Sequence, residues 1–99
     1  MRHIYVIELD MAVLELKRFH AANSQYQAGK PLAYVGLTSR EPQLRFEQHK
    51  KGFKCSRLVK TYGIKLIHKQ CEVIESPSYD VALSREAAKA TELRKRGWG

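Results

Sequence analysis

Two tyrosines, an arginine, a histidine and a glutamate have side chains that could act together on a phosphate group. The tyrosines are Tyr5 and Tyr34, Arg45 and His49 are four residues apart, and Glu86 lies in the last third of the chain. A phenol or imidazole can move a proton, a guanidinium binds phosphate oxygens, and a carboxylate can hold a hard divalent cation. These residue types together favour metal-assisted cleavage of a phosphodiester bond.

The two tyrosines fall in segments that are typical of strands. Residues 3–9 (HIYVIEL) and 31–39 (PLAYVGLTS) are rich in β-branched and aromatic residues. If these strands pair, Tyr5 and Tyr34 can face the same side of the sheet, and Gly36 leaves room there for a substrate. The alternative is that the tyrosines are ordinary strand residues and that Gly36 marks a bulge.

The arginine and the histidine lie in a predicted helix over residues 42–51. Their spacing of four puts Arg45 and His49 on one face of that helix. The guanidinium could balance developing negative charge, and the imidazole could bind the same phosphate or move a proton. The alternative is a solvated helix with ordinary surface residues.

The glutamate lies in a predicted helix over residues 78–97, with Ser78 as its cap and Gly97 at its end. One face of this helix carries Ala82, Glu86, Ala90 and Leu93. A carboxylate in an apolar stripe is costly unless it is paired or binds a metal, so Glu86 is a candidate ligand for Mg²⁺ or Mn²⁺. A buried contact between Glu86 and an arginine or tyrosine is the structural alternative.

The remaining segments complete an α+β pattern with a small, antiparallel sheet. Thr38 or Ser39 is expected to cap the helix over 42–51, which should stop at Gly52. Further predicted elements are a short helix over 11–20, a loop over 23–31, a helix over 54–63 that ends at Gly63, and a third, longer strand over 64–75.

Length and charge limit the kind of protein this is. The 99 residues predict one domain over residues 1–99. The net charge is +8, and residues 40–69 hold nine Lys and Arg against two Asp and Glu. A basic region of this density suits a polyanion, most simply nucleic acid. The cations expected to contact its phosphates include Lys50, Lys51, Lys54 and Arg57.

The expected cellular compartment rests on three features of the sequence: its apolar runs, its first residues and its cysteines. No apolar run approaches the roughly 20 residues needed to span a bilayer, and the first residues do not resemble a signal peptide. Cys55 and Cys71 form no CxxC pair, which gives zinc little support, and both are expected to be reduced. We therefore expect a cytoplasmic protein with no membrane partner.

The order of these motifs resembles the GIY-YIG nuclease family. The matching segments are HIY at 3–5, YVGLTS at 34–39, RFEQHKKG at 45–52 and LSREAAKATELRKRGWG at 83–99. The resemblance implies a three-stranded antiparallel sheet flanked by helices. It also implies hydrolysis of DNA phosphodiester bonds with one divalent ion, Mg²⁺ or Mn²⁺, in repair, recombination or defence.

The resemblance also implies a role for each site residue. Glu86 would hold the metal, Arg45 would contact the scissile phosphate, and His49 would lie one turn further on. One motif tyrosine would help to activate the attacking water, directly or through a relay, and the other would orient water or phosphate. Tyr5 is the preferred base. Since a free phenol titrates near pH 10, a metal ion or a cationic neighbour must make it usable.

Two departures leave other functions open. His3 replaces the glycine of the first motif, and the asparagine that many members carry after the glutamate helix is missing, since Asn23 precedes the second strand. The alternatives are a catalytically inactive nucleic-acid-binding module on the same fold, and a protein-interaction or toxin–antitoxin component. A second copy of the chain or a targeting protein is a further candidate partner.

Overall fold

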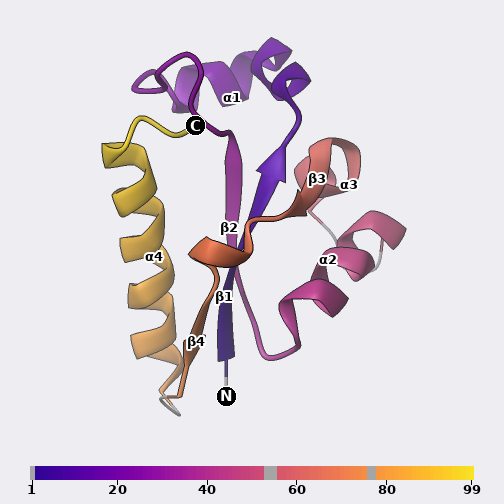
Figure 1. The fold of residues 1–99 in the computed structure, drawn as a ribbon, viewed down its shortest axis with the longest axis vertical. Coiled ribbons are helices and arrows are strands. Elements are labelled where there is room, and N and C mark those ends of the chain that lie inside the picture. Colours follow the sequence, from indigo (N-terminus) through magenta and orange to yellow (C-terminus); the bar gives the residue numbers. More distant parts are fainter. Residues whose placement is uncertain (1, 53–55, 76–77) are drawn as a thin grey trace.

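The computed structural model describes residues 2–52, 56–75 and 78–99 (Figure 1). Lys54 and Cys55, and the first part of the helix predicted over 54–63, lie outside these residues. The elements follow one another as β1 (Arg2–Leu9), the 3-10 helix η1 (Met11–Glu15), α1 (Lys17–Ala22), β2 (Ala33–Thr38), α2 (Pro42–Lys51), α3 (Arg57–Tyr62), β3 (Gly63–Leu66), the 3-10 helix η2 (His68–Gln70), β4 (Glu72–Ile74) and α4 (Tyr79–Lys95).

The sheet has four antiparallel strands, with β1 at its centre. β2 pairs along one side of β1, and β3 and β4 pair with successive parts of the other side. The prediction of three strands was therefore wrong in one respect, because the segment 64–75 is interrupted. Five residues, 67–71, stand opposite only Tyr5 and Val6, and the surplus turns out of the sheet as η2.

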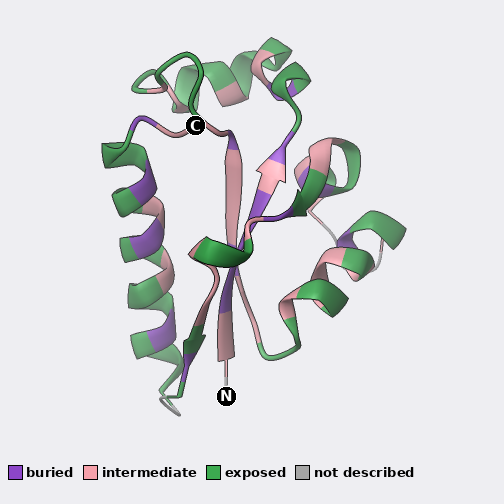
Figure 2. Cartoon of the chain, in the orientation of Figure 1, coloured by how far each residue is buried: buried purple, intermediate pink, exposed green. Residues whose placement is uncertain are grey.

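Helices cover both faces of the sheet. On one face, Val59 of α3 packs against Tyr5 and Ile7 of β1, and α2 lies beside it. On the other face, α4 packs through Ala82 against Ile4. Figure 2 shows the buried stripe of α4 turned toward the strands. The sheet therefore separates the layer of α2 and α3 from the layer of α4.

The ends of the helices mostly follow the local signals. Gly52 ends α2 in the left-handed conformation with φ of 89°, and the Ser78 hydroxyl accepts a hydrogen bond from the Val81 N–H at the start of α4, as predicted. The predicted cap of α2 is wrong. Its N-cap residue is Glu41, and Thr38 Oγ1 instead accepts from the Arg40 N–H in a local turn.

The segment before β2 is more broken than expected. The helix predicted over 11–20 is divided at Leu16, whose extended backbone separates η1 from α1. The last residues then bind back to the loop that follows α1. The Gln27 N–H donates to the Gly97 carbonyl at 2.8 Å, and the Ala33 N–H donates to the Gly99 carbonyl at 2.9 Å. The end of α4 is thus fixed against the start of β2.

Within the described ranges, none of the helices has the length and apolar character that crossing a membrane requires.

Candidate active site

The register of β1 and β2 explains the glycine in the second strand. Tyr5 stands directly opposite Gly36, and its ring lies across the glycine. A Cβ at Gly36 would overlap Cζ and Oη of Tyr5 and would lie 2.7 Å from Cε1. The sequence predicts open space for a substrate here, but the ring of Tyr5 fills it. Gly36 therefore positions Tyr5, and the strand contains no bulge at this point.

His49 reaches the Tyr5 hydroxyl from α2. Both side chains are buried, with 1% and 2% of their surface exposed, and His49 Nε2 lies 2.9 Å from Tyr5 Oη. The Ser56 N–H donates to His49 Nδ1 at 3.0 Å, so this nitrogen carries no proton. Nε2 is then the protonated nitrogen, and His49 donates its hydrogen bond to Tyr5. The histidine is a buried partner of the tyrosine, and the solvated alternative is excluded.

The electrostatics of this pair agree with that arrangement. Burial lowers the pKa of His49, and the Arg45 guanidinium lowers it further, so the imidazole is neutral near pH 7. Burial raises the pKa of the Tyr5 phenol, and the Tyr34 phenol adds to the rise. The Arg45 guanidinium opposes the rise by its charge and by a hydrogen bond to Tyr5. The Tyr5 proton is therefore held firmly until another cation approaches.

Three rings meet at this point of the sheet. The centroids of Tyr5 and Tyr34 are 6.2 Å apart, those of Tyr5 and His49 are 5.9 Å apart, and those of Tyr34 and His49 are 5.8 Å apart. Tyr34 is half-buried, whereas the other two rings are almost inaccessible to water. We call Tyr5, Tyr34, Arg45 and His49 the tyrosine cluster. Of the two phenols in this cluster, Tyr34 is the more accessible to water.

Glu86 lies in the other layer. It is half-buried on the same stripe of α4 as Ala82 and Leu93, as the spacing predicts. That stripe faces the opposite side of the sheet from the tyrosine cluster. Among the described residues, no side chain forms a hydrogen bond or ion pair with the Glu86 carboxylate, so the alternative contact with an arginine or tyrosine is absent there. Burial raises the pKa of Glu86.

A half-buried carboxylate without a partner fits a divalent cation, because the cation would replace the missing counter-charge. The described residues contain no group of three His, Cys, Asp or Glu side chains that could enclose such an ion. Glu86 would therefore supply one oxygen ligand, and water and substrate phosphate would supply the others. This ligand set is typical of Mg²⁺.

The edge of β2 joins the two layers. A cavity of about 220 Å³ lies between this strand, α1 and α4. Tyr34 lines it from the strand, and Asn23 and Arg94 contribute polar groups. Sequence reasoning missed Asn23 and Arg94 as site residues. The only available signal was that Arg94 lies two turns after Glu86 on the same helix.

The side chains that were predicted to bind phosphate differ in how accessible they are. Lys51 and Arg57 are exposed on the layer of α2 and α3, whereas Lys54 lies outside the described residues. The ammonium group of Lys50 already has hydrogen-bond partners within the protein. Its Nζ donates to the carbonyls of Lys60 and Gly63 at 2.9 and 3.0 Å, and it therefore caps the C-terminal end of α3.

Comparison with protein-family models, with curated proteins and with solved structures finds no match to this chain.

Proposed function

We propose that this protein is a divalent-metal-dependent endonuclease of the GIY-YIG type that hydrolyses phosphodiester bonds of DNA. The observation that carries the proposal is the tyrosine cluster. Residues 5, 34, 45 and 49 come from two strands and a helix, yet their side chains meet at one point. Three of the sequence motifs that resemble this nuclease family, those with Tyr5, Tyr34 and Arg45–His49, are therefore also neighbours in space, whereas the motif with Glu86 lies in the other layer. The antiparallel sheet flanked by helices agrees with the fold that the resemblance implies.

The accessibility of the two phenols supports a relay. Tyr34 is half-buried and can meet a water molecule, whereas Tyr5 is 2% exposed and cannot do so directly. In the proposed mechanism Tyr5 first loses its own proton to solvent. Tyr34 then orients the attacking water, takes its proton and passes its own phenolic proton to the Tyr5 phenolate. The Nε2–H of His49 and the Arg45 guanidinium both donate to Tyr5 and stabilise the phenolate when it forms. Arg45 also faces the scissile phosphate and balances its developing charge.

Glu86 is the proposed metal ligand. When bound, the ion supplies Lewis-acid stabilisation of the phosphate charge and lowers the pKa of nearby oxygen acids. The open edge of β2, with its cavity beside Tyr34, supports a phosphate position between the layer of the tyrosine cluster and the layer of α4. The exposed Lys51 and Arg57 would hold the flanking DNA backbone.

The test is nicking of supercoiled plasmid at low salt with Mg²⁺, Mn²⁺ or EDTA. We expect metal-dependent nicks that Glu86→Gln removes and that its control Glu92→Gln, an exposed carboxylate on the same helix, retains. Tyr5→Phe should lower the rate by about 10²- to 10⁴-fold, the usual contribution of a proton-transfer group, whereas Tyr79→Phe should not. Nicks that persist in Glu86→Gln would contradict the proposed metal site.

A catalytically inactive nucleic-acid-binding module is the second candidate. It is favoured by the separation of Glu86 from the tyrosine cluster by the sheet, and by the raised pKa of Tyr5. Plasmid that is bound but never nicked in either metal would select this function. Binding that is insensitive to salt would exclude both candidates, since phosphate contacts weaken steeply as salt rises.

A further inference from the structure

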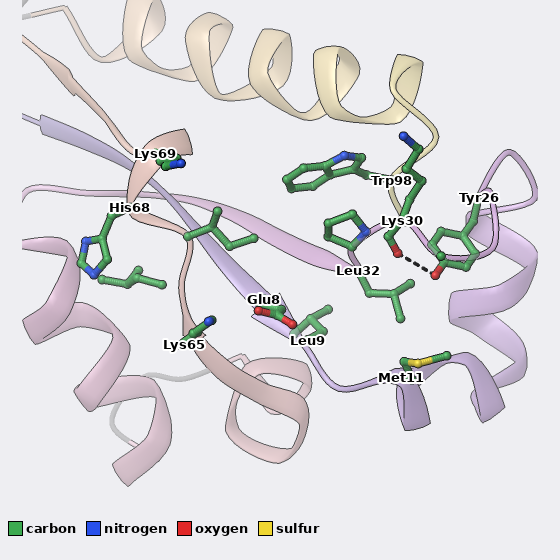
Figure 3. Close-up of a pocket in the computed structure, with 14 residues that line it drawn as sticks. Glu8, Leu9, Met11, Tyr26, Lys30, Leu32, Lys65, His68, Lys69 and Trp98 are labelled. Atoms are coloured by element: carbon green, nitrogen blue, oxygen red, sulfur yellow. Dashed lines mark hydrogen bonds between the residues drawn. The ribbon is translucent and has the colours of Figure 1, made fainter.

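A second cavity lies apart from the tyrosine cluster. Its volume is about 550 Å³, within the range of small-molecule sites. It is formed by the end of β1, the loop at 26–32, the segment 65–69 and Trp98 (Figure 3). No member of the tyrosine cluster lines it.

The charge around this cavity suits an anion. Lys30, Lys65 and Lys69 line it and are exposed, and the single carboxylate among its lining residues is Glu8. Among the described residues, no ion pair joins any of these lysines to an acid. Three ammonium groups are therefore free to contact phosphate oxygens.

An aromatic ring is held in place in the same cavity. Trp98 is half-buried, and Figure 3 shows its indole among the lining side chains. The backbone N–H of Trp98 donates to the Leu93 carbonyl at 3.1 Å, and the backbone carbonyl of Trp98 accepts from Gln25 Nε2 at 3.2 Å. On the opposite side, the Tyr26 hydroxyl donates to the Lys30 carbonyl at 2.7 Å. A ring on a fixed backbone is a stacking platform that loses little entropy on binding.

The carboxylate of Glu8 adds an acceptor to this site. Glu8 is half-buried on β1, opposite Lys65 of β3, but the two side chains form no ion pair. Within the described part of the chain it has no hydrogen-bond partner. A half-buried acceptor without a donor favours a ligand that brings an N–H group, such as the amino group of a nucleobase.

We propose that this cavity binds one unpaired nucleotide of a nucleic acid strand. Trp98 stacks on the base, Glu8 accepts from the base amino group, and Lys30, Lys65 and Lys69 contact the neighbouring phosphates. The inference rests on the proposed function for the class of ligand, and it narrows the substrate to DNA with a single-stranded segment.

A flap, branch or overhang with unpaired nucleotides fits the inference, whereas an uninterrupted duplex does not.

The test uses the fluorescence of Trp98, which is the only tryptophan of the chain. The native protein is titrated in EDTA with oligo(dC) and oligo(dT) of about 12 nucleotides, with a duplex of equal length and with an abasic strand. We expect saturable quenching by oligo(dC), weaker quenching by oligo(dT), and little by the duplex or the abasic strand. Because metal is absent, the result does not depend on cleavage.

Two variants assign the contacts. Lys65→Gln with Lys69→Gln should weaken oligo(dC) binding by about tenfold and lower the salt slope by about two, one for each phosphate contact, whereas Lys17→Gln on α1 should change neither. Glu8→Leu should remove the preference for oligo(dC) over oligo(dT). Its far-ultraviolet circular dichroism shows whether the variant is folded.

The outcomes separate this inference from the proposed function. Saturable quenching without any plasmid nicking would support the nucleotide site while the nuclease proposal fails. Nicking without quenching by any oligonucleotide would overturn the nucleotide site and leave the nuclease. Equal quenching by the abasic strand would also overturn it, because the cavity would then respond to phosphate charge alone.

Discussion

Replacing Gly36 with alanine tests the contact that organises the tyrosine cluster. The added Cβ would overlap the tip of the Tyr5 ring, so the ring must retreat. The retreat would overpack a buried site, at about 1–3 kcal/mol, and would lengthen the 2.9 Å hydrogen bond from His49, at about 1–3 kcal/mol for a buried polar group left unpaired. We expect Gly36→Ala to lower the free energy of unfolding by about 2–6 kcal/mol.

The assay is urea unfolding followed by Trp98 fluorescence, for Gly36→Ala, Tyr5→Leu and the double variant. Leucine lacks the ring atoms that meet the new methyl group. In the Tyr5→Leu background, Gly36→Ala should therefore be neutral or slightly stabilising, because alanine has less backbone entropy to lose than glycine. The coupling energy between the two sites should be at least about 2 kcal/mol.

Two results would refute this reasoning. One is an equal loss of stability from Gly36→Ala in both backgrounds, which would place the clash elsewhere. The other is no loss in the native background, which would mean that Tyr5 does not lie across Gly36. The predicted loss of 2 kcal/mol corresponds to a fall in Tm of roughly 8–16 °C for a domain of this size, so either result is easily resolved.

Three further predictions concern charge. The nicking rate should rise about tenfold per pH unit through neutrality, because the raised pKa of Tyr5 keeps the phenolate scarce there, and a flat profile would rule out Tyr5 as the base. Lys50→Gln should lower Tm and Lys51→Gln should not, because only Lys50 caps α3; equal Tm values would contradict the cap. Lys89 and Arg85 hold the pKa of Glu72 below its ordinary value of 4.5, so the stability that Glu72 contributes is present above that value. This stability should be lost as the pH falls below 4.5 and Glu72 becomes protonated. Lys89→Met should make the free energy of unfolding fall less steeply with acid, and an unchanged acid profile would refute the pairing of Lys89 with Glu72.

Local signals were sufficient to predict the main elements that carry the site. Alternation in β1, the proline and glycine that bound α2, and the Ser78 cap of α4 are each determined by neighbours in sequence. The spacing of Ala82, Glu86 and Leu93 also predicted that these residues share one apolar face of α4. They could not predict η2. This turn arises because only two residues of β1 lie between the positions that pair with β3 and with β4, whereas five residues connect β3 to β4.

The contacts within the site depend on distant parts of the chain and had no sequence signal. His49 is buried because Ser56 and Tyr5 satisfy both of its ring nitrogens, and these residues lie on either side of it in the chain. The ring of Tyr5 fills the space above Gly36 only because the strand register brings the two together. Residue types therefore led to the proposed chemistry, whereas the orientation of each group required the tertiary structure.

The central position of β1 has a consequence for biosynthesis. This strand is translated before the segments that pair with it, which begin at residue 33 and end at residue 74. Its four consecutive buried residues, 4–7, stay uncovered while those partners are being translated. The contacts of Gly97 and Gly99 with the loop before β2 form only after those residues are translated as well. During that interval the unpaired edges of β1 are open to pairing with another molecule.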